Sequence, residues 1–347
     1  MNNTSLPNQT PNKNVLTFPS GATAASSNAQ VRDDALTSVG MPVGYAADEN
    51  GIYELRDNKE GDAMFIHICS PLVVKGRCRN AVGHGWSLVL AVQDPDGAWH
   101  EFVLGGQQLT KSANVALAPL YDRGFELEPV KKAAESVMNM LSIWRPEDRY
   151  LRFDRLGWTD TKHDAFVLGN GRVIGDVLVA TDSVSEDLMA GFHTRGTLAA
   201  WKKEVAAPCV GNPLMTLVVA HAFTGPLMSV LGLTGGGFHL RGLSSRGKST
   251  TQYAATSVWG ERSQLQSWDG TPSGFQGIAA VFNDTFLNIE ELHKADPRTV
   301  GDTIYTLADG RGRLRAKSNA KLQTPQRWRV PILSSGEVSL EEHMASA

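Results

Sequence analysis

A short glycine-rich segment carries the clearest chemistry in this sequence. Residues 242–249 read Gly-Leu-Ser-Ser-Arg-Gly-Lys-Ser and fit the pattern G-x-x-x-x-G-K-[ST]. Small residues at these positions let consecutive backbone N–H groups turn inward around a phosphate, while Lys248 reaches the β and γ phosphates and Ser249 binds magnesium. A glycine-rich turn without nucleotide is the alternative, but a β-type run precedes the loop and a helical run follows it. The sequence therefore predicts a site for ATP and Mg formed by Gly242, Leu243, Ser244, Ser245, Arg246, Gly247, Lys248, Ser249 and Thr250.

Two adjacent glutamates follow an apolar run further along the chain. Nucleotide hydrolysis needs one acidic residue to hold magnesium and another to activate water, normally at the end of a buried strand. We expect Glu290 to accept from a magnesium-bound water and Glu291 to orient or deprotonate the attacking water. Asn288 inside the apolar run and Glu in place of the usual first Asp are departures, so the division of roles between the two acids stays open. Taken alone, such a pair more often marks a helix N-terminus on a solvated face.

The last apolar run, residues 329–333, predicts a strand that ends in Ser334, Ser335 and Gly336. In the additional-strand class of phosphate-loop ATPases, the strand after the acidic one ends in a polar residue that senses the γ-phosphate. Ser335, or its neighbour Ser334, stands at that place. An ordinary Ser-Gly turn before the capping-box sequence at residues 339–342 accounts for the same residues equally well.

Positive charge is concentrated just before that strand. Residues 311–329 read RGRLRAKSNAKLQTPQRWR, with seven Lys or Arg and no acid. Gly310 and Gly312 permit a tight bend, and each phosphate contact by a basic side chain adds salt-sensitive binding through counterion release. A solvated loop is one alternative, and an arginine that serves a neighbouring subunit's nucleotide is another. The candidate DNA-binding residues of this hairpin are Arg311, Arg313, Arg315 and Lys317.

Composition places the chain among ordinary globular proteins. It has 347 residues, 41% of them hydrophobic and 20% charged, which suggests about two domains. A net charge of −3 gives no global attraction to nucleic acid. Three scattered cysteines fit a reducing cytoplasm, and His67, Cys69, Cys78 and His84 match no common zinc spacing. Polar residues interrupt the most apolar stretch, 213–233, which predicts a buried helix rather than a membrane span.

Pattern changes along the chain suggest three regions. Residues 1–40 are polar and lack the order of a signal peptide, so we expect a disordered tail. Residues 41–195 hold short β-type runs with turn dipeptides and a helical spacing at 128–144, which predicts a smaller α+β domain. In residues 196–347 strand and helix patterns alternate, which predicts an α/β fold with a parallel sheet.

With these residues in view, the sequence resembles a family of bacterial, phage and mobile-element proteins known as domain of unknown function 927. The resemblance runs from about Met41 to the end of the chain. Besides the phosphate loop, it rests on ordered matches at Gly51-Ile52-Tyr53, Ile68-Cys69-Ser70-Pro71-Leu72, Leu156-Gly157-Trp158, Trp268-Asp269-Gly270-Thr271, Glu290-Glu291, Gly310-Arg311-Gly312-Arg313 and Ser335-Gly336-Glu337.

Members of that family look like oligomeric ATPases of the AAA+ type, related to helicase motors with a hairpin before the sensor strand. The resemblance therefore implies a P-loop NTPase core that assembles into a homo-oligomeric ring. It also implies ATP hydrolysis that depends on single-stranded DNA, during replication of a phage or mobile element. Family members continue well beyond the point where this sequence ends, so we expect an incomplete core without a fifth strand, helical lid or later arginine finger. The alternative is a nucleotide-binding module without motor activity that acts in protein or DNA recruitment.

Overall fold

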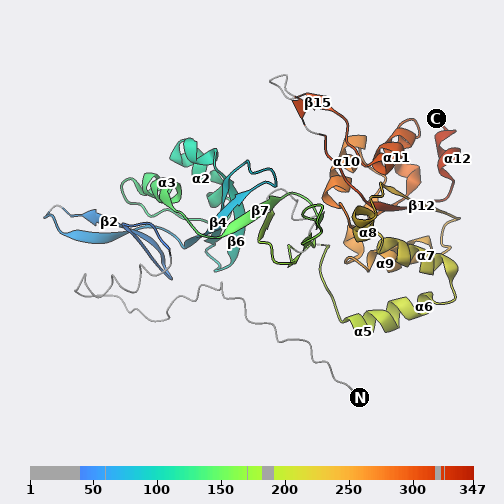
Figure 1. Ribbon diagram of the computed structural model, residues 1–347, viewed down its shortest axis with the longest axis horizontal. Coiled ribbons are helices and arrows are strands. Elements are labelled where there is room, and N and C mark those ends of the chain that lie inside the picture. The colour runs from blue at the N-terminus through green and yellow to red at the C-terminus, as the bar shows by residue number, and fades with distance from the viewer. Residues whose placement is uncertain (1–39, 59, 170, 182–190, 317–321, 324) are drawn as a thin grey trace, which may run out of the picture. The chain divides into compact units, whose positions relative to one another are not determined.

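The computed structural model describes residues 40–347 except 59, 170, 182–190, 317–321 and 324 (Figure 1). The expected tail therefore lies outside the described residues, apart from Gly40. By its internal contacts the chain forms two compact units, Met1–Arg77 with Ser87–Asp148, and Cys78–Trp86 with Arg149–Ala347. The contacts thus group with the second unit the described residues between 149 and 195, which the sequence pattern assigned to the first domain. The domain boundary near residue 195 stays a prediction.

The first unit combines antiparallel strands with short helices. A three-stranded antiparallel sheet has the order β1-β2-β3, and β5 and β6 form a hairpin. Buried and exposed side chains alternate along β4, so one face of that strand enters the core. Leu90, Leu117 and Met140 are fully buried in this core. The elements are β1 (Tyr45–Asp48), β2 (Gly51–Asp57), β3 (Ala63–Cys69), β4 (Leu72–Arg79), β5 (Ser87–Gln93), β6 (Trp99–Gly105), η1 (Gln108–Thr110), α2 (Ala113–Tyr121) and α3 (Ala133–Ile143).

Short strands and helices open the second unit. Three of the strands form an antiparallel sheet of order β10-β9-β8, and β7 runs parallel to β11. The Leu156 N–H donates to the Val281 carbonyl at 2.8 Å, which attaches this segment to the helix that ends there. The elements are β7 (Arg149–Phe153), β8 (Gly157–Trp158), β9 (Phe166–Val167), β10 (Val173–Ile174), β11 (Val179–Thr181), α5 (Leu198–Trp201), η2 (Lys202–Ala206), α6 (Ala207–Cys209), α7 (Pro213–Ala222) and α8 (Gly225–Val230).

The apolar stretch at 213–233 forms two helices, α7 and α8. The Asn212 side chain caps α7 by accepting from the Met215 N–H at 3.2 Å, and Pro213 occupies the first turn, where its missing N–H costs nothing. The predicted helix start is therefore confirmed. Within the described part of the chain, no helix combines the length and apolar character that crossing a membrane requires.

A four-stranded parallel sheet forms the centre of the second unit. Its order is β12-β17-β14-β13, so β17, the last strand in the sequence, lies between β12 and β14. The remaining elements are β12 (Gly236–Arg241), α9 (Lys248–Thr256), η3 (Arg262–Gln264), β13 (Gln266–Ser267), α10 (Pro272–Val281), β14 (Leu287–Glu290), η4 (Leu292–Lys294), α11 (Val300–Asp309), β15 (Arg315–Ala316), β16 (Leu322–Gln323), β17 (Pro331–Gly336) and α12 (Leu340–Met344).

Consecutive side chains of the central strands enter cores on opposite faces of this sheet. Ile332 packs in one cluster with Phe275 of α10, whereas Leu333 packs in the other with Val218 of α7 and Ala255 of α9. Figure 1 shows α10 and α11 on one side of β12, and α7 and α9 on the other. Both faces are thus covered by helices, which is the mixed α/β arrangement expected of a parallel sheet.

Candidate functional site

The predicted phosphate loop lies in the turn between β12 and α9. Ser245 and Gly247 have positive φ angles of 60° and 86°, a left-handed conformation that helps successive N–H groups face the same side. Lys248 begins α9, and its Nζ donates to the carbonyl oxygens of Gly242 at 2.6 Å and Leu243 at 2.9 Å. The ammonium group therefore bonds the loop's own carbonyls, and an anion entering the loop would meet both this charge and the positive end of the helix.

The side chains of the loop are accessible. Gly242 and Lys248 are half-buried, and the exposed residues are Leu243, Ser244, Ser245, Arg246, Gly247, Ser249 and Thr250. The hydroxyl of the next residue, Thr251, is instead turned into the protein and donates to the Gly247 carbonyl at 3.0 Å. Ser249 is thus positioned on the first, open turn of α9, where a hydroxyl can reach a cation held by a phosphate.

The two predicted acids lie at the same edge of the sheet as this loop. Glu290 is the last residue of β14 and Glu291 follows it with a φ of 64°. In the parallel register Arg241 of β12 is opposite Gly336 of β17, and Ile289 of β14 is opposite Ser334. Because the carboxyl ends of parallel strands share one edge, the loop after β12 and the acids after β14 lie at that edge with β17 between them.

The two carboxylates differ in their electrostatic surroundings. Burial raises the pKa of Glu290, and the neighbouring charge of Glu291 raises it further, while Lys294 and Arg262 act in the opposite direction. A hydrogen bond from Lys294 lowers the pKa of Glu291, whose Oε2 is 2.5 Å from the Lys294 Nζ. Glu291 is therefore held in its ionised form, and protonation is favoured more at Glu290.

A buried polar network lies directly beneath the loop. Gln252 of α9, fully buried, donates from Nε2 to the Asn288 side-chain oxygen at 2.7 Å and to the Ile289 carbonyl at 3.2 Å. Asn288 donates in turn to the Thr256 hydroxyl at 2.8 Å, and the Ser335 hydroxyl donates to Gln252 Oε1 at 2.8 Å. These bonds connect α9 to β14 and β17. They account for the polar Asn288 inside an otherwise apolar strand, since buried polar groups need partners.

The two serines of β17 point to opposite faces of the sheet. Ser335, 4% exposed, belongs to the network under α9. The Ser334 hydroxyl, on the other face, accepts from the Trp268 Nε1–H at 2.9 Å and is 3.0 Å from His239 Nδ1. Both hydroxyls therefore have partners inside the protein, and γ-phosphate sensing by Ser335 stays a prediction. The capping box at residues 339–342 is confirmed at the start of α12.

Sequence reasoning missed three side chains close to this edge: Gln252, Arg262 and Lys294. The Arg262 guanidinium lies 3.8 Å from the centre of the Tyr253 ring and donates to its hydroxyl at 2.6 Å. Lys294 is the ion-pair partner of Glu291. The spacing of Lys294, three residues after Glu291, could have suggested this pair, whereas Gln252 and Arg262 gain their meaning only from the tertiary contacts.

The basic segment forms an antiparallel ribbon. Gly310 ends α11 with a φ of 71°, and a Cβ there would be 2.4 Å from the Trp328 carbonyl oxygen, so glycine is required. Arg311 pairs with Arg327, and the Gly312 N–H donates to the Gln326 carbonyl at 2.9 Å. Pairing of β15 with β16 continues the ribbon, which extends away from the parallel sheet in Figure 1.

The arginines expected to bind DNA begin this ribbon. Arg311 and Arg313 are exposed, and the Arg313 guanidinium forms a loose ion pair, 3.9 Å from the Asp302 carboxylate. Arg315 is the first residue of β15. Lys317 lies outside the described residues. The ribbon is thus positioned to present positive charge to solvent, although its contact with DNA stays a prediction.

The histidines and cysteines considered for zinc do not gather. Within the described ranges, no group of three or more His, Cys, Asp or Glu side chains forms a potential metal site. Cys69 and Cys78 are buried, and burial raises the pKa of the Cys69 thiol. Both cysteines are therefore suited to packing rather than to metal binding or nucleophilic chemistry.

Comparisons with known proteins identify a similar fold and a protein family. Among solved structures, a chain described as "SCCmec type IV Cch - active helicase" matches with a TM-score of 0.64 at 20% sequence identity. The match covers 86% of this chain and 55% of that one, so this chain spans about half the length of the solved protein, and the likeness shows the fold alone. No curated protein matches the sequence. A family model described as "Domain of unknown function (DUF927)" matches residues 45–327, and the chain therefore belongs to this family.

Proposed function

We propose that this protein is an AAA+-like ATPase, a motor that uses ATP hydrolysis to act on DNA as a helicase or translocase. The observation that carries the proposal is the strand order β12-β17-β14-β13. It puts one strand between the strand that leads into the phosphate loop and the strand that ends in the acids, as in the additional-strand class of P-loop NTPases. The fold likeness to a chain described as an active helicase supports the same assignment.

ATP would bind with its phosphates in the loop at residues 242–250. Lys248 would exchange its bonds to two loop carbonyls for the β and γ phosphates, which is possible because its ammonium group is already at the mouth of the loop. Glu291, held ionised by Lys294, is suited to orient the attacking water.

The residues at this edge also fit a magnesium ion. Mg²⁺ prefers oxygen ligands and is usually held by one or two protein groups together with the phosphates of its nucleotide. The exposed hydroxyl of Ser249 and the carboxylate of Glu290 supply such oxygens at the ends of α9 and β14. The ion, when bound, would neutralise charge that develops on the transferred phosphoryl group.

The basic ribbon would contact single-stranded DNA in a cytoplasmic, ring-shaped homo-oligomer that serves a phage or mobile element. Arg311, Arg313, Arg315 and Lys317 are the contacting residues of this proposal. Its support is the exposure of the first two guanidinium groups and the loose ion pair of Arg313, which leaves that charge available to a phosphate.

ATP hydrolysis with and without single-stranded DNA tests the proposal. Lys248→Ala should reduce kcat by roughly 10²–10³-fold, the size of effect seen when one group that stabilises transition-state charge is removed. Lys162→Ala is the matched control, because Lys162 is also exposed in the second unit but lies outside the loop. Wild-type phosphate release no higher than that of Lys248→Ala would refute the motor.

Charge reversal in the ribbon tests the DNA contact separately. Arg311→Glu with Arg313→Glu should abolish stimulation of ATP hydrolysis by DNA while leaving hydrolysis without DNA unchanged. Stimulation that survives this double substitution would overturn the assignment of the ribbon, without affecting that of the phosphate loop.

A further inference from the structure

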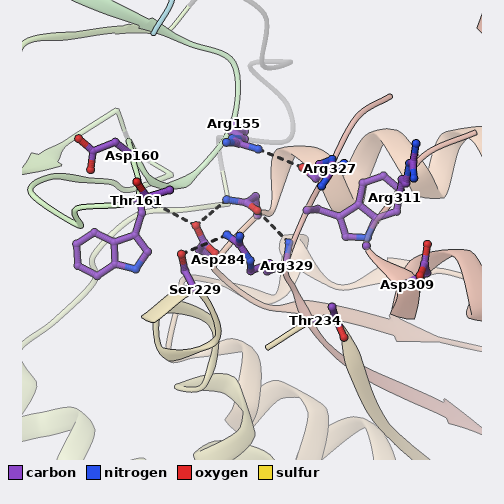
Figure 2. Close-up of a pocket in the computed structure, with 14 residues that line it drawn as sticks. Arg155, Asp160, Thr161, Ser229, Thr234, Asp284, Asp309, Arg311, Arg327 and Arg329 are labelled. Atoms are coloured by element: carbon purple, nitrogen blue, oxygen red, sulfur yellow. Dashed lines mark hydrogen bonds between the residues drawn. The ribbon is translucent and has the colours of Figure 1, made fainter. Parts of the chain in front are cut away.

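A cavity of about 490 Å³ opens at the amino edge of the parallel sheet, the edge opposite the phosphate loop. Residues two or three positions before the start of three strands line it: Thr234 before β12, Asp284 before β14 and Arg329 before β17. The segment with Arg155 and Trp158 closes another side. Figure 2 shows Arg329 beside Asp284 and Ser229, with Arg155 and Arg327 further along the same cavity.

Arginine dominates the lining. Arg155, Arg311, Arg327 and Arg329 all line the cavity, and within the described residues no ion pair joins any of them to a carboxylate. Arg155 donates to the Arg327 carbonyl at 3.1 Å and Arg329 donates to the Ser229 hydroxyl at 3.2 Å. Each of these two guanidinium groups thus keeps most of its five N–H donors for a ligand.

The floor of the cavity is built by a buried polar cluster. Asn283 donates to the Asp284 Oδ2 at 2.7 Å and accepts from the Arg329 backbone N–H at 3.0 Å. The Trp158 backbone N–H also donates to Asp284 Oδ2, at 3.1 Å. These bonds fix the backbone at Arg329 and Trp158. Asp284 is 1% exposed, and its Oδ1 has no hydrogen-bond partner among the described residues. The positive charges of Arg329 and Arg155 act on this carboxylate, so a phosphate in the cavity would be held by the arginines and not by Asp284.

The net charge of the lining side chains indicates which phosphate ligand suits the cavity. Four arginines against three aspartates, Asp160, Asp284 and Asp309, leave a formal charge of +1 on the lining. This excess matches the single charge of a phosphodiester better than the several charges of a free di- or triphosphate. Arg311 and Arg327 both line the cavity and pair with each other in the basic ribbon, so the cavity continues into the ribbon.

We propose that this cavity binds the phosphodiester backbone of single-stranded nucleic acid at the root of the ribbon. Planar guanidinium groups bind phosphate oxygens through paired N–H donors, which favours arginine over lysine at such a site. The inference shares with the proposed function only the expectation that nucleic acid is the partner. It adds Arg155, Arg327 and Arg329, which lie outside the residues first expected to bind DNA.

Binding of a fluorescently labelled 20-residue oligo(dT), followed by anisotropy at several salt concentrations, tests the proposal. Arg155→Gln with Arg329→Gln should weaken binding about tenfold or more and reduce the log–log salt slope by about 2, because each lost phosphate contact removes roughly one unit. Arg172→Gln with Arg298→Gln removes the same charge from exposed positions of the second unit and should leave the slope unchanged. Arg329→Lys, which keeps the charge, should retain most of the slope.

Two results would overturn the proposal. The first is that the Arg155→Gln, Arg329→Gln protein binds oligo(dT) with the same affinity and the same salt slope as wild type. The other comes from labelled ADP added to Lys248→Ala protein: residual ADP binding that depends on Arg155 and Arg329, with oligo(dT) binding unaffected, would make the cavity a free-nucleotide site. Failure of the proposed function is read separately, as ATP hydrolysis that does not depend on Lys248.

Discussion

Substitution of Ser335 by alanine separates a structural role of its hydroxyl from a role at the nucleotide. The hydroxyl donates to Gln252 Oε1 at 2.8 Å, with Ser335 4% exposed and Gln252 fully buried. A buried acceptor that loses its donor costs about 1–3 kcal/mol. For a unit of this size, each kcal/mol shifts the melting temperature by roughly 2–4 °C, so Ser335→Ala should lower it by about 2–12 °C.

The assay combines thermal unfolding, followed by tryptophan fluorescence, with kcat measured well below the transition. We expect kcat per folded molecule to change by less than about threefold, because the hydroxyl is engaged within the core. Ser273→Ala is the control, since Ser273 is exposed and its hydroxyl bonds the exposed Thr271 hydroxyl at 3.2 Å. A second control is a double-mutant cycle with Gln252→Met, in which a coupling free energy of about 0.5–3 kcal/mol identifies direct contact.

The opposite pattern would refute this reasoning. An unchanged melting temperature together with a hundredfold lower kcat would mean that the Ser335 hydroxyl acts on the nucleotide, as the position of the residue in the last strand first suggested. A lower melting temperature with no coupling free energy between Ser335→Ala and Gln252→Met would also contradict the reasoning, because the effect would then not come from their hydrogen bond.

Two further predictions concern the floor of the amino-edge cavity. Gly157→Ala should lower the free energy of unfolding by about 2–5 kcal/mol, because Gly157 has a φ of 99° and a new Cβ would be 2.6 Å from Asp284 Cβ. Gly171→Ala, with a φ of 75° and open space, should cost only about 1–2 kcal/mol, and equal losses in urea unfolding would contradict the close packing. Burial raises the pKa of Asp284, so its stabilising contribution is complete below the pKa of the unfolded chain, near 3.8, and is lost as pH rises through the folded-state pKa. Wild type should therefore lose stability relative to Asp284→Asn between pH 4 and neutral pH, and a difference that stays constant in urea unfolding at several pH values would rule this out.

The features that the sequence predicted well are local ones. The turn between β12 and α9, the Asn212 cap of α7 and the capping box of α12 each depend on residues a few positions apart, so they can be recognised in the printed order. Helix limits were less accurate. The spacing at 128–144 predicted a helix, but α3 begins only at Ala133 because Lys132 has a left-handed backbone with a φ of 63°.

Family membership also followed from the sequence, since a model of the family matches residues 45–327, which hold the short motifs scattered from residue 51 to residue 313. The strand order could not be read in this way. Nothing local to residues 331–336 says that this strand inserts between β12 and β14 rather than adding at an edge, because hydrogen bonding between parallel strands joins segments far apart in the chain.

The sequence by itself determined which residues could bind a phosphate, which acids could assist hydrolysis, and where positive charge is concentrated. Only the tertiary structure decided what those residues face. It turned Ser335 and Gln252 toward each other beneath the loop, and it brought Arg155 to the root of the ribbon. The physical reason is that side chains alternate across a strand, so a shift of one position moves a hydroxyl from one core to the other, and the helices that pack on each face determine the partners it meets there.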